Sequence, residues 1–343
     1  MLPDLRPDGI ANESPHVLIL GAGASRAACP KGDRNGRPLP LMADLVETVG
    51  LTQILEEAGI SRDSHANFEN LYGEIAADSR RQDLRIVFET KIRDYFDDLE
   101  LPNHVTVYDK LLLSLRKKDM IATFNWDPFL AQAYRRNSRS AWLPEIAFLH
   151  GNVAAGICHE HKRKGFYGEC CRACDKPYEQ SRLLYPVADK AYRDDAYISG
   201  EWACLEAKLR RAFLLTIIGY SAPVSDVNAR ELLHLAWNEN GTRNLAEVEI
   251  VDIRPDRQLL KSWQDFITGD HCLLTPRIGR TLSLRYMRRS CDAFASAVLM
   301  NDPWPEKPMP RYARLDRLHR WCWPLVCEET DYYENGVPLR RFA

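Results

Sequence analysis

Five short apolar runs constrain the fold of this chain more than any other feature. They cover residues 17–20, 120–123, 146–149, 213–218 and 248–253, and stretches with helical periodicity separate them. Runs of this length that are bounded by Gly, Asn, Asp or Pro are typical of strands buried in a parallel sheet. Because the strands alternate with helices, the pattern predicts an α/β fold with a doubly wound parallel sheet.

Two segments interrupt this alternation. Residues 39–118 are almost wholly helical in pattern, with Ile86, Ile92, Tyr95 and Phe96 on one helix face, which predicts an inserted helical lobe. Residues 156–180 are polar and rich in Cys, His and Gly, which predicts a small separate module. We expect the main domain to span residues 1–300, followed by a Pro-rich linker and an aromatic C-terminal tail over 301–343. That tail is too aromatic to be disordered and is expected to pack on the body or on a partner.

The composition excludes several classes of protein. The chain has 343 residues, of which 45% are hydrophobic and 27% charged, as in a folded globular protein. Its formal charge of −2 does not indicate a polyanion as partner. No apolar run has the length that a membrane span needs, and the first residues lack the apolar segment of a secretion signal, so we expect a cytoplasmic protein. Ten cysteines in such a chain indicate metal binding or burial rather than disulfides.

The first apolar run leads into a glycine turn, "HVLILGAGAS". Gly21 and Gly23 permit close backbone approach, and Ser25 can donate a hydroxyl, so the turn can hold a phosphate. A tight strand–helix turn without a ligand remains the alternative. A dehydrogenase would place an acidic residue about 20 positions on, at the end of a strand. That distance leads to Asp44, inside a helical pattern, so the dehydrogenase pattern fails.

Two later runs also end in polar side chains. Asn125 and Asp127 follow the second run, and His150 follows the third. Because the carboxyl ends of parallel strands line the ligand crevice of such sheets, we expect all three to face the glycine turn. An imidazole there can act as a base near neutral pH. Turn-forming or helix-capping roles for Asn125 and Asp127, and a structural role for His150, are the alternatives.

Four motifs in this order resemble the SIR2 superfamily: "GAGAS", "TFNWD", "LHG" and "IIGYSAPVSD". They are most similar to its bacterial SIR2-like branch of antiphage-defence NAD hydrolases. "PLPLMADL", "NFENLYGEI" and "LLYPVADKAY" are similar to the same branch, and the resemblance spans about residues 16–255.

The resemblance implies a Rossmann-like NAD site whose residues all lie at strand ends or in the turns after them. The pyrophosphate would be held by Gly21, Ala22, Gly23 and Ser25. The resemblance places Asn125 and Asp127 at the nicotinamide ribose and makes His150 the catalytic histidine. It also implies that Gly219 and Ser221 form the turn after the fourth strand and that Asp252 binds the adenosine ribose. Arg254 complicates this last role, because it is expected on the same side of the chain as Asp252.

One segment departs from the family. Sirtuins follow the glycine turn with a Gly-Ile-Pro-Asp-Phe-Arg segment, where this chain has "CPKGDRNGRPLPL". Arg34 or Arg37 could replace the missing arginine. The departure puts peptide deacylation in doubt and leaves cleavage of the glycosidic bond possible.

The polar module carries Cys158, His161, Cys171 and Cys174 at zinc-ribbon spacing. Thiolates and an imidazole suit a tetrahedral Zn²⁺, and four protein ligands make the site structural. His159 or Cys170 could replace one of these ligands, and a loop without metal is the alternative. Sirtuins carry a zinc knuckle at this point, usually with four cysteines.

Together these features predict an NAD⁺ glycohydrolase that releases nicotinamide and ADP-ribose. The resemblance also implies a defence-system partner, such as an ATPase or translocase or a nucleic-acid sensor, and a homo-oligomer without membrane contact. An NAD-dependent deacylase and a non-catalytic sensor of NAD or ADP-ribose remain alternatives. A nucleic-acid-directed subunit is the third, because residues 210–213 and 277–289 are basic enough to contact phosphates.

Overall fold

A six-stranded, wholly parallel sheet forms the centre of the molecule. The computed structural model describes residues 13–60, 67–187, 192–221, 226–267 and 271–342. The sheet comprises β1 (His16–Leu20), β2 (Met120–Thr123), β3 (Glu145–Phe148), β7 (Leu214–Ile218), β8 (Glu247–Val251) and β9 (Cys272–Thr275), in the order β3-β2-β1-β7-β8-β9. Numbered along the chain, this is the 3-2-1-4-5-6 order of doubly wound dinucleotide-binding sheets. The predicted fold class is confirmed.

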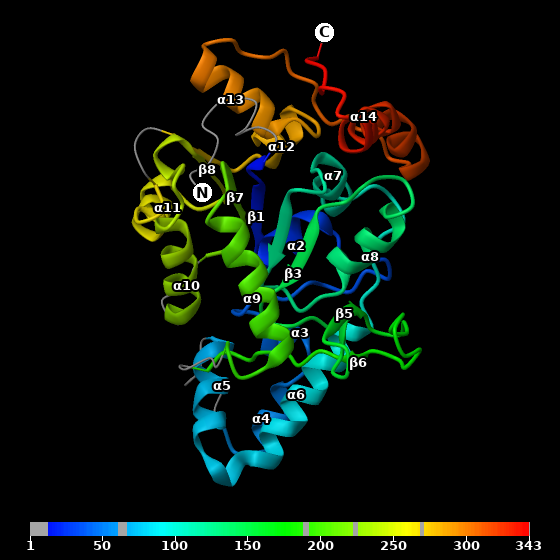
Figure 1. The fold of residues 1–343 in the computed structure, drawn as a ribbon. Coiled ribbons are helices and arrows are strands. Elements are labelled where there is room, and N and C mark those ends of the chain that lie inside the picture. Colours follow the sequence, from blue (N-terminus) through cyan, green and yellow to red (C-terminus); the bar gives the residue numbers. More distant parts are fainter. Residues whose placement is uncertain (1–12, 61–66, 188–191, 222–225, 268–270, 343) are drawn as a thin grey trace.

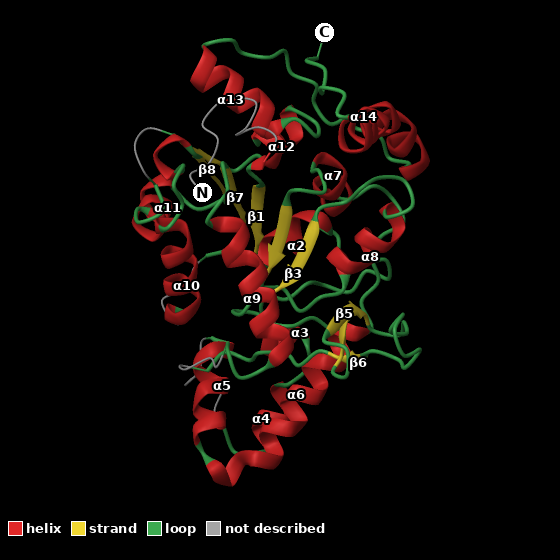
Figure 2. Ribbon diagram, in the orientation of Figure 1, coloured by secondary structure: helices red, strands yellow, loops and turns green. Residues whose placement is uncertain are grey.

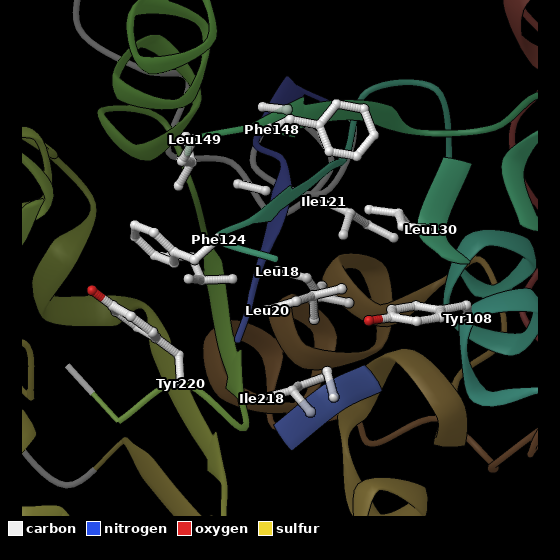
Figure 3. Close-up of a cluster of buried hydrophobic side chains, with 14 of the residues drawn as sticks. Leu18, Leu20, Tyr108, Ile121, Phe124, Leu130, Phe148, Leu149, Ile218 and Tyr220 are labelled. Carbon is white, nitrogen blue, oxygen red and sulfur yellow. The ribbon is translucent and has the colours of Figure 1, made fainter. Parts of the chain in front are cut away.

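Burial on both faces explains why the strands read as continuous apolar runs. Every residue of β1 is fully buried, and Leu18 and Leu20 lie in one apolar cluster with Ile121 and Ile218 from the neighbouring strands (Figure 3). Five of the six strands lie within about two residues of the predicted runs. The sixth, β9, was not predicted, because it is an edge strand of which three of the four residues are only partly buried.

Helices cover both faces of the sheet (Figure 2). On one face α2 (Ala22–Ala28), α7 (Val107–Ser114) and α8 (Phe129–Asn137) pack together; on the other, α9 (Ala196–Leu209) packs on β2 and β3 and against α10 (Val227–Asn238), and α11 (Asp256–Trp263) follows β8. The direction of winding reverses between β1 and β7. In sheets of this kind the ligand crevice lies at that point, outside the carboxyl ends of the strands.

A helical lobe projects beyond the carboxyl ends of the strands (Figure 1). It comprises α3 (Leu45–Thr48), α4 (Thr52–Glu57), α5 (Phe68–Ala77), the 3₁₀ turn η2 (Ser79–Arg81) and α6 (Gln82–Asp97). The helix α7, inside the same predicted span, lies instead in the body against α2 and α8. Ile86, which we expected on the buried face of α6, is 51% exposed, and Phe88, Ile92 and Phe96 form that face.

A second, smaller sheet follows β3. It is antiparallel, in the order β5-β4-β6, and its strands are β4 (Ala155–Cys158), β5 (Arg163–Phe166) and β6 (Glu179–Gln180). Segments this short bury little apolar surface, so they need another source of stability. The predicted Cys/His ligands lie on the ends of these strands and in the turns between them.

The C-terminal segment packs on the opposite end of the body from the lobe (Figure 1). It includes η4 (Ile278–Arg280), α12 (Leu282–Arg285), α13 (Ser290–Met300) and α14 (Leu315–Asn335); the 3₁₀ turn η3 (Arg243–Leu245) lies earlier, between α10 and β8. Residues 301–310 are tied to α12, since the N–H groups of Lys307 and Met309 donate to the carbonyls of Arg285 and Leu284. Leu318, Cys322 and Leu325 form the buried face of α14. Within the described part of the chain, no helix could cross a bilayer.

Candidate functional site

The glycines after β1 and β7 lie in two turns that interlock at the switch point. Gly219 has a φ of +60°, and a Cβ atom there would lie 2.6 Å from the nitrogen of Ala24. A Cβ atom on Gly21 would lie 2.5 Å from the carbonyl oxygen of Gly219. The N–H of Gly23 donates to that same oxygen at 3.1 Å. Close backbone packing therefore requires these glycines whether or not a phosphate binds beside them.

Four side chains near the carboxyl ends of β1 and β2 form one buried hydrogen-bonded group, and they come from α2, α7 and the turn after β2. Ser25 donates to Asp127 at 2.6 Å, and the amide of Asn125 donates to Ser25 Oγ at 2.9 Å and to the carbonyl of Gly21 at 2.9 Å. Tyr108, from α7, lies 2.6 Å from Ser25 Oγ. The structure thus brings three of the predicted residues together and adds Tyr108, which sequence reasoning missed.

The carboxyl of Asp127 is poised to change its charge near neutral pH. Burial raises its pKa to about 6, and hydrogen bonds from Ser25 and from the N–H of Phe129 act in the opposite direction by stabilising the charged form. A carboxyl group of this kind at a strand end is a candidate functional group, because it can hold or release a proton under physiological conditions.

His150 lies on the neighbouring turn, with partners of its own. Its ring meets Phe124 edge-on at 4.8 Å between centroids, and its Nε2 lies 2.8 Å from the hydroxyl of Tyr192. That hydroxyl donates to Asp226 at 2.7 Å. Sequence reasoning did not select Tyr192 or Asp226, although each is the last residue of a motif that carried the resemblance.

Asn152 connects the turn after β3 to the turn after β2. Its amide donates to the carbonyls of Asn125 and Asp127 at 3.0 Å and 2.7 Å. Asn125, Asp127 and His150 are therefore held in a fixed arrangement at adjacent carboxyl ends, as the strand order requires.

Asp252 lies directly after β8, and its carboxylate is paired with Arg254. One oxygen accepts the N–H of Arg254 at 2.9 Å, and the other accepts its guanidinium at 2.8 Å. Arg254 thus lies on the same side as Asp252, as alternation along the chain indicates. Ser221 lies exposed after Tyr220, beyond the end of β7.

The two arginines that we considered as replacements in the departing segment lie at the surface. Arg34 pairs with Glu100 at 3.2 Å, and Arg37 pairs with Asp98 at 3.2 Å. Neither belongs to the buried group around Asn125.

The four predicted metal ligands converge. The donor atoms of Cys158, His161, Cys171 and Cys174 all lie within 4.8 Å of one another. Cys158 Sγ is 3.6 Å from His161 Nδ1 and 3.7 Å from Cys174 Sγ. Two thiolates on a tetrahedral zinc ion lie about 3.8 Å apart, given Zn–S bonds of about 2.3 Å. The donor set and its spacing fit Zn²⁺.

Each half of this cluster is built in the same way. Lys162 follows the pair Cys158 and His161 directly and has a φ of +49°. Asp175 follows the pair Cys171 and Cys174 in the same way and has a φ of +54°. A tight knuckle at each end of the module turns two donors toward one point. The alternative ligands are not among these converging donors: His159 Nε2 lies 3.6 Å from Glu179, and Cys170 is exposed.

A cavity of about 480 Å³ separates the lobe from the segment that precedes α9. Its walls include Arg85, Glu89 and Arg93 from α6, and Tyr185 opposite them. The ring of Tyr185 packs on Trp126 at 5.1 Å, so the cavity borders the turn after β2. A molecule in this cavity would lie next to the candidate site.

Three of the five arginines in the basic run at residues 277–289 form ion pairs within the molecule. Arg288 forms a fully buried ion pair with Glu329 at 2.6 Å, and Arg289 pairs with Glu329 and Glu328 at 3.1 Å. Arg285 pairs with Glu306 at 2.7 Å. These arginines fix α14 and its approach to the body. Arg277 and Arg280, from the same run, are exposed.

No family model matches the chain, and no curated protein matches it. Solved structures that it is similar to include one described under the mechanism and regulation of Sir2 enzymes, with 13% identity, a TM-score of 0.38 and coverage of 84% of this chain and 93% of that chain. Another is Sir2 bound to an acetylated peptide, with 15% identity, a TM-score of 0.36 and coverage of 85% and 94%. A third is a Sir2 complex with a peptide and NAD⁺, with 15% identity, a TM-score of 0.36 and coverage of 85% and 95%.

Proposed function

We propose that this chain is an NAD⁺ glycohydrolase that cleaves the bond between nicotinamide and ribose. One observation carries the proposal: Asn125, Asp127 and His150 lie at adjacent strand ends beside the Gly21–Ser25 turn, at the switch point of a 3-2-1-4-5-6 sheet. The ordered motifs, with their resemblance to the SIR2 superfamily, support NAD⁺ as the ligand of this crevice.

The reaction breaks the bond between C1′ of the ribose and the ring nitrogen of nicotinamide. The electron pair of that bond leaves with nicotinamide, and the sugar develops oxocarbenium character. The Asp127 carboxylate and the oxygen dipole of the Asn125 side chain are the groups of this site that can stabilise such a cation. Water then adds at C1′, and His150 is the base that takes its proton. The products are nicotinamide, ADP-ribose and a proton.

The zinc module has a structural role in this proposal. Cys158, His161, Cys171 and Cys174 would hold one Zn²⁺ and fasten the small sheet, leaving no open coordination position for chemistry. Its contribution to cleavage is indirect, because the segment that follows it contacts the site: the N–H of Leu184 donates to the carbonyl of His150 at 2.9 Å.

The decisive experiment is to incubate the purified protein with NAD⁺ and to follow nicotinamide and ADP-ribose. Formation of both in equal amounts supports hydrolysis. Consumption of NAD⁺ only in the presence of an acetylated peptide would identify a deacylase instead. Saturable binding of NAD⁺ without release of nicotinamide would identify a sensor.

The same proposal includes a role in bacterial antiphage defence, with cytoplasmic depletion of NAD⁺ upon infection. An effector of this kind needs an inactive state, so the chain would act with a partner or as a homo-oligomer. The projecting lobe α3–α6 and the outer face of α14, where Trp323 is 56% exposed, are the candidate contact surfaces. Repeating the assay with the product of the neighbouring gene tests this part. An unchanged rate and an unchanged oligomeric state would contradict it.

A further inference from the structure

His150 belongs to a chain of hydrogen bonds that ends on a buried carboxylate. Its Nε2 lies 2.8 Å from Tyr192 Oη, and Tyr192 Oη lies 2.7 Å from Asp226 Oδ1. Tyr220 donates to the other oxygen, Asp226 Oδ2, at 3.0 Å. The three connected side chains come from three places: the turn after β3, the segment before α9 and the residue before α10.

The protons in this chain can be placed one at a time. Burial, and then the neighbouring Asp226 carboxylate, raise the pKa of the Tyr192 phenol, so the phenol keeps its proton. The same causes raise the pKa of Tyr220 well above its usual value. An ionised carboxylate only accepts hydrogen bonds, so both phenols donate to Asp226.

This arrangement fixes the tautomer of His150. The hydroxyl hydrogen of Tyr192 points to Asp226, so its oxygen can only accept from the imidazole. The neutral ring therefore carries its hydrogen on Nε2, and the basic lone pair of the ring, which can accept a proton, is on Nδ1.

Ring contacts keep the geometry rigid. The rings of His150 and Tyr192 lie nearly parallel, with an interplanar angle of 16°, and Tyr192 packs on Trp202 at 4.8 Å. On the other side Phe124 contacts His150 and stacks on Tyr220 at 4.1 Å. Figure 3 shows Phe124 and Tyr220 side by side at the end of the sheet.

We propose that Tyr192 and Asp226 are positioning residues, which hold His150 as the Nε2–H tautomer and stabilise its protonated form. When Nδ1 takes a proton from water, the ring becomes an imidazolium, and Asp226 Oδ2, which lies 3.8 Å from Nε2, offsets the new charge. The catalytic half of this inference rests on the proposed function, in which His150 is the base. The tautomer half stands on the resting protein alone.

The first test needs no activity. We would label the full chain with ¹⁵N-histidine and record long-range ¹H–¹⁵N spectra, assigning the ring of His150 by its loss in His150→Gln. The expected result is an Nε2–H ring in the wild type and in Tyr220→Phe, and a mixture of tautomers in Tyr192→Phe. An Nδ1–H ring in the wild type, or an unchanged ring in Tyr192→Phe, overturns the inference.

The second test separates positioning from packing. Tyr192→Phe and Tyr220→Phe each remove one phenol hydroxyl from the same carboxylate and keep the ring, but only Tyr192 contacts His150. We expect Tyr192→Phe to lower kcat by about 10- to 100-fold, part of the contribution of a general base, with the Kd for NAD⁺ unchanged. Tyr220→Phe should lower kcat by no more than about fivefold, because the Tyr220 hydroxyl bonds the carboxylate of Asp226 and has no hydrogen bond to His150 in this network. Equal losses in the two variants would contradict the catalytic half. If no preparation cleaves NAD⁺, the proposed function fails while the spectra still decide the tautomer.

Discussion

The hydroxyl of Ser25 donates to the carboxylate of Asp127 at 2.6 Å, across the gap between the turns after β1 and β2. The sequence indicates Ser25 as part of a phosphate-binding turn, and Asp127 as a turn residue or a residue at the nicotinamide ribose. Their contact places both in one buried group, together with Asn125 and Tyr108. The protonation state of Asp127 is therefore coupled to the geometry of the whole crevice.

The first prediction concerns pH. Burial raises the pKa of Asp127 to about 6. Only the ionised carboxylate can stabilise a cation or accept a charge-assisted hydrogen bond from the Ser25 hydroxyl. A raised carboxyl pKa means that the charge is lost as pH falls through about 6. We expect NAD⁺ cleavage to rise with pH through this range. Asp127→Asn should lower kcat and remove this limb of the profile.

The same shift affects stability with the opposite sign. Between pH 3.8, the usual pKa of the group, and about 6, the folded state binds the proton more tightly than the unfolded state. The contribution of Asp127 to the free energy of unfolding therefore falls as pH rises over this range. The free energy of unfolding of Asp127→Asn should be measured with denaturant at pH 4 and at pH 8, beside that of the wild type. The variant should be more stable relative to the wild type at pH 8 than at pH 4. A constant difference would contradict the assigned shift.

The second prediction tests the base. His150→Ala should lower the rate of NAD⁺ cleavage by about 10²- to 10⁴-fold, because a general base contributes on that order. His104→Ala, at an exposed histidine of the loop before α7, is the matched control. Nicotinamide release by both variants is the measurement. Retention of near wild-type turnover by His150→Ala would remove His150 from the mechanism.

The third prediction tests the amide of Asn125, which also bonds the carbonyl of Gly21. Asn125→Ala should abolish cleavage and also cost about 1–3 kcal/mol of stability, since the two buried hydrogen bonds from its amide to the Gly21 carbonyl and to Ser25 Oγ are lost. A variant that remains folded at the assay temperature, as judged by thermal unfolding, and still cleaves NAD⁺ would show that Asn125 is purely structural.

The fourth prediction concerns the metal. The purified protein should contain about one equivalent of zinc per chain, measured by elemental analysis without exposure to chelator. Cys171→Ser should lower the zinc content and the unfolding temperature more than it lowers intrinsic cleavage, because a closed site contributes folding free energy. Cys170→Ser changes the adjacent exposed cysteine and should leave both unchanged. Less than about half an equivalent of zinc per chain in the wild type would contradict the assignment of a zinc site.

The sheet and the metal ligands could be predicted because their signals are local. A continuous buried run such as Val17–Leu20 is readable without knowledge of its neighbours, and two Cys/His knuckles need only their spacing. The edge strand β9 gave no such signal, since only one of its four residues is fully buried. Ile86 was misplaced because helical periodicity gives a face but not the identity of its partner.

The partners of the site residues could not be predicted, because they depend on contacts between distant segments. Tyr192 and His150 are 42 positions apart, and Tyr108 and Ser25 are 83 apart. Nothing in the local sequence of a tyrosine shows that its hydroxyl meets a histidine or a serine. The same holds for Arg288, which belongs to a basic run in the sequence but is buried in an ion pair with Glu329.

The last prediction concerns the choice between NAD and NADP, and it depends on Asp252 and Arg254. A carboxylate at this strand end hydrogen-bonds the adenosine 2′- and 3′-hydroxyls of NAD and repels the 2′-phosphate of NADP. Here the guanidinium of Arg254 lies 2.8 Å from that carboxylate and reduces the repulsion. We still expect NAD to be preferred, because Arg254 is engaged by both oxygens of Asp252 through its N–H and its side chain.

Asp252→Asn should narrow the ratio of kcat/KM for NAD over NADP by roughly tenfold, or about 1.4 kcal/mol. Arg254→Gln should widen the ratio, because it removes the cation and keeps a hydrogen-bond donor. Equal use of both nucleotides by the wild type would mean that Asp252 does not read the ribose, and a ratio that Arg254→Gln leaves unchanged would show that the arginine has no part in the choice.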